Sequence, residues 1–158
     1  MKLFTLRTAV LAACLLGGTA FAQTVQADQP VHADQAWARA TAPQQAVGSA
    51  YVRLTSPAAD RLVSASSPAA AQVTIHQMQM EGSIMRMRAL PNGLVLPPGQ
   101  AVTLEPGGNH LMLEGLTTPL VAGQTIALQL KFEHAPPLDL QVTVAPAGAR
   151  GPVMGMHH

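Results

Sequence analysis

The chain alternates short apolar runs with turn-forming residues. From Asp34 onward, runs with strand character are separated by Pro, Gly, Asn and Ser. Period-two alternation of apolar and polar residues is clearest in QTIALQLKFEH (124–134) and LDLQVTV (138–144). No stretch combines a helical period with capping residues. The pattern predicts strands at 34–39, 48–55, 60–66, 71–80, 84–90, 101–105, 109–115, 124–134 and 138–145, which is typical of a β-sandwich or small barrel.

The N-terminal segment has the features of a secretory signal peptide. An apolar run follows a positive start, and the small-x-small site Ala20-Phe21-Ala22 precedes Gln23. The run is too short to span a membrane comfortably. Leu11-Ala12-Ala13-Cys14 resembles a lipoprotein cleavage box, but the apolar run before it is very short. We therefore expect cleavage after Ala22, export to the periplasm and no lipid anchor at Cys14.

The remaining chain is long enough for one domain with its own core. We expect a signal peptide at 1–22, a loose leader at 23–33, a β-domain at 34–146 and a flexible tail at 147–158.

Charge and cysteine content exclude several classes of protein. Loss of Lys2 and Arg7 leaves 7 Lys and Arg (9 minus 2) against 8 acids, so the net charge changes from +1 to −1. Without basic clusters, nucleic acid and anionic membrane surfaces are not expected partners. The only cysteine, Cys14, leaves with the signal peptide, which excludes a blue-copper electron-transfer site. No Ser-His-Asp set, carboxylate pair or phosphate loop supports an enzyme.

Methionine and histidine gather in two stretches, HQMQMEGSIMRMR (76–88) and GGNHLMLEG (107–115). One interpretation is core packing, because the chain has only one Trp, one Tyr and three Phe and must fill its core with Leu, Val, Ile and Met. The other is a soft metal site. Two imidazoles and several thioethers favour Cu(I) and would also accept Ag(I).

Strand geometry gives the metal interpretation a specific form. If Glu81-Gly82 is a two-residue turn, Met78 faces Met85 and His76 faces Met87. The side chains of His76, Met78, Met80, Met85 and Met87 would then share one face of a hairpin. Whether Met78, Met80 and Met85 bind metal or only surround it is left open by the sequence.

A second strand carries the remaining candidate ligands. His110 and Met112 are two residues apart, so they also share a face, and a turn at Gly107-Gly108 could bring them near the hairpin.

Other residues have structural interpretations. Arg86 and Arg88 should point to the opposite face of the hairpin. His32 and His134 are isolated and expected at the surface, and Trp37 is expected in the core.

The spacing resembles that of the periplasmic copper chaperones of the PCuAC family. The pattern is His76, ten residues, Met87, 22 residues, then His110-x-Met112. Supporting stretches are WARATAPQQAVGSAYVRLTS (37–56), MEGSIMRMR (80–88) and LPPGQAVTLEPGGNHLMLEGL (96–116), and the resemblance covers roughly residues 30–146.

The resemblance implies a fold, a ligand set and a function. The fold would be an all-β, cupredoxin-like Greek-key β-sandwich or barrel. His76, Met87, His110 and Met112 would bind one Cu(I), and the protein would deliver it to cytochrome c oxidase subunit II alongside Sco-type copper proteins. We also expect a monomer. The alternatives are a copper buffering or resistance protein without a dedicated recipient, and a metal-free adaptor with a Met-rich patch.

The C-terminal tail lies outside the resemblance. Met154, Met156, His157 and His158 are candidates for a secondary site that would bind Cu(II), since imidazoles and the terminal carboxylate suit that ion. The alternative is an inert end.

Overall fold

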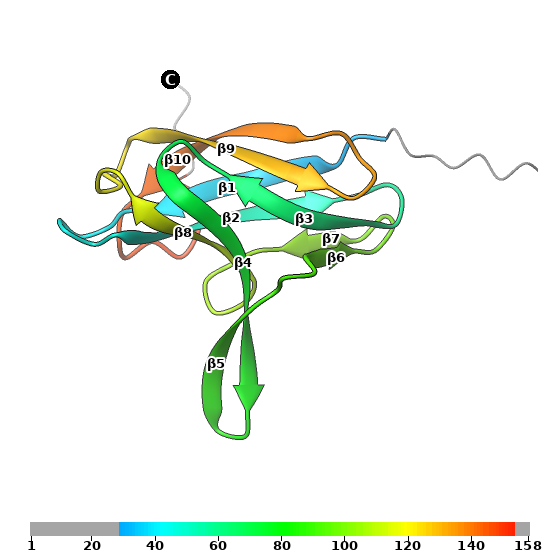
Figure 1. Cartoon of the computed structure of the whole chain (residues 1–158), viewed down its shortest axis with the longest axis horizontal. Coiled ribbons are helices and arrows are strands. Elements are labelled where there is room, and N and C mark those ends of the chain that lie inside the picture. Colours follow the sequence, from blue (N-terminus) through cyan, green and yellow to red (C-terminus); the bar gives the residue numbers. More distant parts are fainter. Residues whose placement is uncertain (1–28, 154–158) are drawn as a thin grey trace, which may run out of the picture.

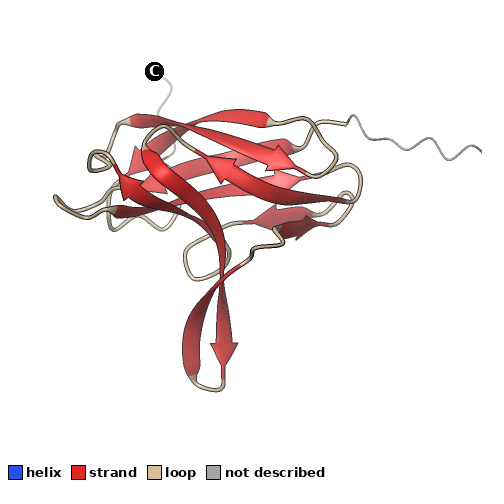
Figure 2. Ribbon diagram, viewed as in Figure 1, coloured by secondary structure: helices blue, strands red, loops and turns tan. Residues whose placement is uncertain are grey.

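The computed structural model describes residues 29–153 and consists of strands, turns and loops (Figure 2). The strands are β1 (His32–Arg39), β2 (Val47–Thr55), β3 (Asp60–Ser66), β4 (Ala70–Glu81), β5 (Ile84–Ala89), β6 (Leu94–Leu96), β7 (Ala101–Thr103), β8 (His110–Leu116), β9 (Thr125–Phe132) and β10 (Leu138–Ala145). Within this described range, no helix is long and apolar enough to cross a membrane. The all-β fold class predicted from the sequence is confirmed.

Seven strands close into a barrel, and three short or projecting strands are added to it. The order β4-β8-β2-β1-β10-β9-β3 is closed by the pairing of Ala65 on β3 with Val73 on β4. β1 and β10 pair in parallel, whereas the other neighbours are antiparallel. β5 extends β4, β6 pairs with β3, and β7 pairs with β2. Closure leaves only short or projecting edges for pairing with other chains.

The core is built from leucine and valine. β9 alternates between exposed and buried residues, as its sequence TIALQLKF predicts. The largest fully buried side chains are Leu54, Leu62, Leu96, Leu104, Leu111, Leu113, Leu120, Leu128, Leu130, Val52, Val142 and Val144. Among the described residues, no methionine belongs to the core. The core-packing interpretation of the methionines is therefore wrong for these residues, because leucine fills the space by itself.

The predicted strands agree with the observed ones to within two residues at each end. β1 begins at His32, two residues earlier than expected, and Val31 before it is buried. The sequence did not predict β6, whose three residues lie between two turns. It forms because Leu94 and Leu96 become buried when the strand pairs with β3.

The hairpin of β4 and β5 projects from the barrel (Figure 1). Its register differs from the expected one by two residues. Met78 pairs with Met87, Met80 with Met85, and His76 with Ala89. The turn is Gly82-Ser83 rather than Glu81-Gly82, because Gly82 adopts the positive φ (63°) needed at the first central position of a type II′ turn.

This shift does not move any side chain to the other face, since two residues are one full period of a strand. His76 and the four methionines of the hairpin therefore share one face, as predicted. Arg86 and Arg88 lie on the opposite face, where both form ion pairs with Glu81.

A small aromatic cluster covers the outside of β1 and β2. The rings of Trp37 and Tyr51 lie 4.5 Å apart, and the Arg39 guanidinium lies over both rings. Arg39 also donates a hydrogen bond to the carbonyl oxygen of Ala149 (2.9 Å), and Ala149 packs against the cluster. The first residues after β10, expected to be mobile, are thus attached to the barrel. Trp37 is buried as expected, but in a separate cluster from the main core.

Asp60 fixes the loop between β9 and β10. It is only 8% exposed, and its carboxylate accepts backbone N–H bonds from Arg61 (2.7 Å), His134 (3.0 Å) and Ala135 (2.9 Å). Burial raises the pKa of this carboxyl, but the three donors and nearby His134 outweigh it and hold the pKa below its ordinary value. His134 contributes through its backbone, in agreement with its expected surface position.

We expect Asp60→Asn to destabilise the protein by about 1–3 kcal/mol, because the amide NH₂ would face a backbone donor. The wild-type contribution should be complete above the unfolded carboxyl pKa of about 3.9 and should be lost as the pH falls through the lower folded value. Urea unfolding at pH 7 and at pH 3 measures both effects. Asp139→Asn, at an exposed carboxylate, is the matched control. Equal stability of the two variants at pH 7 would contradict the assignment.

Candidate metal centre

β4 and β8 bring the two candidate histidines together. Their antiparallel register pairs His76 directly with His110, and the rings lie 5.7 Å apart between centroids. The neighbouring residues Ile75 and Leu111 are buried in the core. Because alternate side chains of a strand point to opposite faces, both imidazoles lie on the outer face of the barrel wall.

The turn before β8 sets the protonation of His110. Gly107 has a φ of 86°, and the Gly108 carbonyl oxygen lies 3.2 Å from His110 Nδ1. A carbonyl only accepts, so Nδ1 donates, and in the neutral ring Nε2 keeps its lone pair. The same carbonyl accepts the backbone N–H of Met78 at 3.2 Å. The predicted approach of the Gly107-Gly108 turn to the hairpin is therefore confirmed.

Met87 lies against the free nitrogen of His110. Its Sδ is 3.3 Å from His110 Nε2. Both atoms present lone pairs in the neutral tautomer, so the contact places two electron donors side by side. Met87 is 47% exposed, whereas His110 is only 8% exposed. The imidazole is thus largely shielded from water, whereas about half of the methionine beside it is exposed.

His76 has one satisfied and one unsatisfied ring nitrogen. Nε2 lies 2.9 Å from the hydroxyl oxygen of Thr74. Nδ1 is buried and has no hydrogen-bond partner among the described residues. If Nε2–H donates to Thr74, Nδ1 holds a buried lone pair that a cation could satisfy.

Met112 lies on the same face as His110, two residues further along β8, where it pairs with Thr74. Contacts thus connect three of the four expected residues, namely His76, His110 and Met87. Met112 is placed on the same face by the strand register. Between residues 29 and 153 no group of three or more His, Cys, Asp or Glu side chains could hold a metal ion. The candidate centre is instead a mixed set of imidazoles and thioethers.

Burial, above all, lowers the pKa of His110 from its ordinary value. The hydrogen bond to Gly108 opposes this effect, and the proximity of His76 adds to it. His110 is therefore neutral at pH 7, which is the form that binds a metal ion.

Two contributors to the site were not found from the sequence. Thr74 and the Gly108 carbonyl orient the two histidines, but neither belongs to the His and Met spacing. Thr74 has a weak signal, because it lies two residues before His76 and so on the same face. A backbone carbonyl carries no sequence signal.

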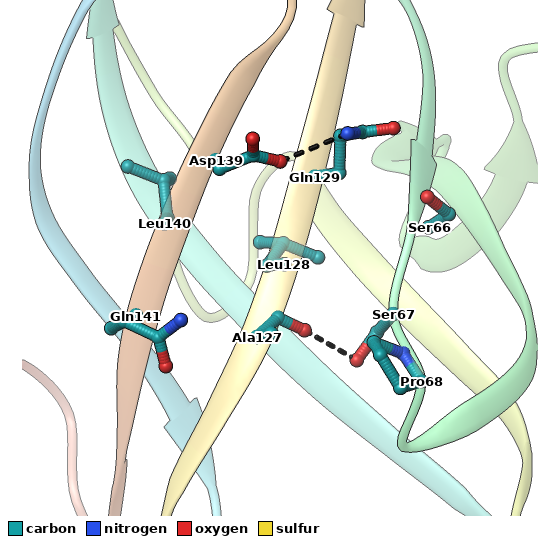
Figure 3. Close-up of a pocket in the computed structure, with 9 residues that line it drawn as sticks. All are labelled: Ser66, Ser67, Pro68, Ala127, Leu128, Gln129, Asp139, Leu140 and Gln141. Atoms are coloured by element: carbon teal, nitrogen blue, oxygen red, sulfur yellow. Dashed lines mark hydrogen bonds between the residues drawn. The ribbon is translucent and has the colours of Figure 1, made fainter.

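A hollow of about 440 Å³ lies elsewhere on the barrel (Figure 3). It is formed by β9, β10 and the end of β3, and it includes the hydrogen bonds from Ser67 to the Ala127 carbonyl and from Gln129 to Asp139. None of the candidate ligands contributes to it.

The segment predicted to be a signal peptide and the tail methionines and histidines lie outside the described residues. His32 is described, and its side chain is 75% exposed, as expected.

Comparison with solved structures defines the class of protein. The apo PCuAC domain from PmoF1 has the same fold, with a TM-score of 0.61 and 23% identity over 73% of this chain and 93% of that chain. The solution structure of CuI-DR1885 from Deinococcus radiodurans is 29% identical, with a TM-score of 0.58 over 80% of this chain and 83% of that chain. The fold is therefore that of PCuAC domains, which confirms the resemblance and the cupredoxin-like fold.

Residues 31–144 match the family described as "Putative lipoprotein LpqE-like", and the chain belongs to this LpqE-like family. A relative from Leifsonia xyli subsp. xyli, "Putative lipoprotein Lxx21020", is 34% identical over 148 residues, which are 88% of this chain and 89% of the relative.

In the metal-free protein, we expect His110 to titrate below the ordinary histidine pKa of about 6.5. The unfolded chain then binds this proton more readily than the folded one. The contribution of neutral His110 to the free energy of unfolding is thus complete above about pH 6.5. It declines as the pH falls towards the pKa of His110 in the folded protein. The chemical shift of the His110 ring protons, followed by NMR with chelator present, measures this. A midpoint at or above 6.5 would contradict the buried, neutral state.

Proposed function

We propose that the protein is an exported copper metallochaperone that binds one Cu(I) through His76, Met87, His110 and Met112. The observation that carries the proposal is the 3.3 Å contact between Met87 Sδ and His110 Nε2, at a nitrogen whose lone pair is held free by Gly108. For comparison, zinc–nitrogen and zinc–thiolate bonds are about 2.0 and 2.3 Å long, and an ion with bonds of that length could contact both atoms at this separation.

The donor set suits Cu(I). Two neutral imidazoles and two thioethers are soft ligands that bring no charge, and soft ligands select Cu(I) over harder divalent ions. Neutral ligands do not compensate the charge of a bound ion, so beside buried apolar strands a monovalent ion costs less than a divalent one. The Cu(I) form of the structural relative DR1885 supports the same choice of ion.

The position of the centre suits transfer rather than catalysis. Met87 is half exposed on a projecting hairpin, so a partner's ligands can replace it at the ion while the histidines still hold it. We therefore propose a binding protein, not an enzyme. By resemblance to PCuAC chaperones, we propose that the recipient is the copper centre of cytochrome c oxidase subunit II and that Sco-type proteins act as partners in the delivery.

Export is supported by the signal peptide pattern and by the lipoprotein descriptions of the family and the relative. The lipoprotein descriptions would agree with lipid attachment at Cys14, in the stretch Leu11-Ala12-Ala13-Cys14. The apolar run before Cys14 remains very short, so we propose a soluble periplasmic product.

We expect the mature chain to begin at Gln23. The intact mass of the protein recovered from the periplasm checks this, and Cys14→Ser should change neither the mass nor the amount recovered, because residue 14 is removed. A lipid-modified Cys14 in the membrane fraction would show that the protein is anchored instead.

We expect Met87→Ala and Met112→Ala to lower Cu(I) affinity roughly tenfold or more, and His76→Ala with His110→Ala to lower it further. Met80→Ala, on the same hairpin face, should change the affinity of the first copper by much less. Competition with a Cu(I) chelator at pH 7.5 measures all four proteins. Unchanged affinity in the double histidine variant would rule out the centre.

A further inference from the structure

The methionines at the end of the hairpin are exposed and do not fill the core. β5 is exposed along its whole length, and Met80 and Met85 are 56% and 50% exposed. The hairpin projects from the barrel (Figure 1), and neither of these two methionines belongs to a core cluster of the described residues. The exposure of these apolar side chains to water needs another reason, because exposed apolar strands favour aggregation.

Strand formation does not explain the residue type either. β-branched and aromatic residues favour strands, whereas methionine is flexible and unbranched. Yet, apart from His76 and Ala89, every residue on this face of the hairpin is methionine, namely Met78, Met80, Met85 and Met87. The only Ile of the hairpin, Ile84, lies on the opposite face with Glu81.

The register brings the thioethers into one group. Met80 and Met85 are directly opposed, so their Cβ atoms lie about 5 Å apart, and Met78 and Met85 are diagonal neighbours within about 8 Å. Three rotatable bonds let each methionine turn its sulfur towards a common point. Met78, opposite Met87, is partly buried and is held by its backbone hydrogen bond to Gly108.

The surrounding charges are directed away from this group. Glu81 forms ion pairs with Arg86 and Arg88 on the other face of the hairpin. The methionine face therefore presents sulfur alone, without a carboxylate that would attract hard cations.

We propose that Met78, Met80 and Met85 form a second metal site, which binds a soft monovalent cation, Cu(I) or Ag(I), through three thioethers. The site is separate from the histidine centre, and Met87 lies between the two. Because thioethers do not titrate, binding there is independent of pH where histidine binding is not. A role of this second site in passing copper to the histidine centre would rest on the proposed function. The existence of the second site does not rest on it.

An apolar docking patch would use the same exposed face. The two roles differ in chemistry, because leucine preserves apolar area and volume but removes the sulfur. Substitution by leucine therefore tests the metal site without removing the patch.

The experiment is an Ag(I) titration of the full chain, with and without Met78→Leu, Met80→Leu and Met85→Leu. Both proteins carry His76→Ala and His110→Ala, so that the histidine centre is removed and every other candidate ligand is common to both. Calorimetry gives the stoichiometry and affinity, and NMR of the methionine methyl groups identifies the ligands. Thermal unfolding confirms that the leucine variant is folded, as expected for exposed positions.

The proposal predicts the loss of one Ag(I) equivalent, or at least a tenfold weaker affinity, in the leucine variant. The equivalent that depends on the three methionines should bind with the same affinity at pH 7.5 and at pH 5. Adding Ile84→Met to the leucine variant, on the wrong face, should not restore binding. A smaller change, or restoration by Ile84→Met, would overturn the site. Neither result depends on the Cu(I) affinity of the histidine centre, so failure of the two proposals is distinguishable.

Discussion

The pairing of β4 with β8 is the constraint on which the rest of the site depends. One half of β4 is part of the barrel wall, where Ile75 is fixed by the core, and the other half leaves the barrel as a hairpin. His76 lies where the two halves meet and is paired with His110. Core-packed strands therefore place the two histidines and Met112, while Met87 is carried on the exposed hairpin.

Shielding and access are divided between different side chains. His110 is buried, and burial keeps it neutral and ready to bind a cation. Met87 covers it from the exposed side and needs no protonation change to bind or release an ion. In the proposed copper site, this arrangement would combine a nitrogen ligand in a low-dielectric environment, which strengthens binding, with an exchangeable thioether, which allows release. A chaperone for a soft ion requires both properties.

The use of methionine follows from how the core is filled. Leucine and valine pack the barrel without help from the flexible thioether side chains, so the hairpin methionines remain free for chemistry. Glu81, Arg86 and Arg88 form ion pairs on the opposite face and leave the methionine face uncharged. The hairpin thus has one charged face and one uncharged methionine face, and the second is where the proposed thioether site lies.

The sequence by itself determined most of the strands and the shared face of the hairpin. Moving the turn by one residue, from Glu81-Gly82 to Gly82-Ser83, shifts the pairing by two residues, which is one full strand period, so every side chain stays on its face. It also limited a soft-metal site to His and Met. Tertiary structure alone decided that β4 pairs with β8, that β6 forms against β3, and that the Gly108 carbonyl orients His110. These features depend on contacts between distant segments and on a backbone carbonyl, a group that every residue type carries, so no local pattern specifies them.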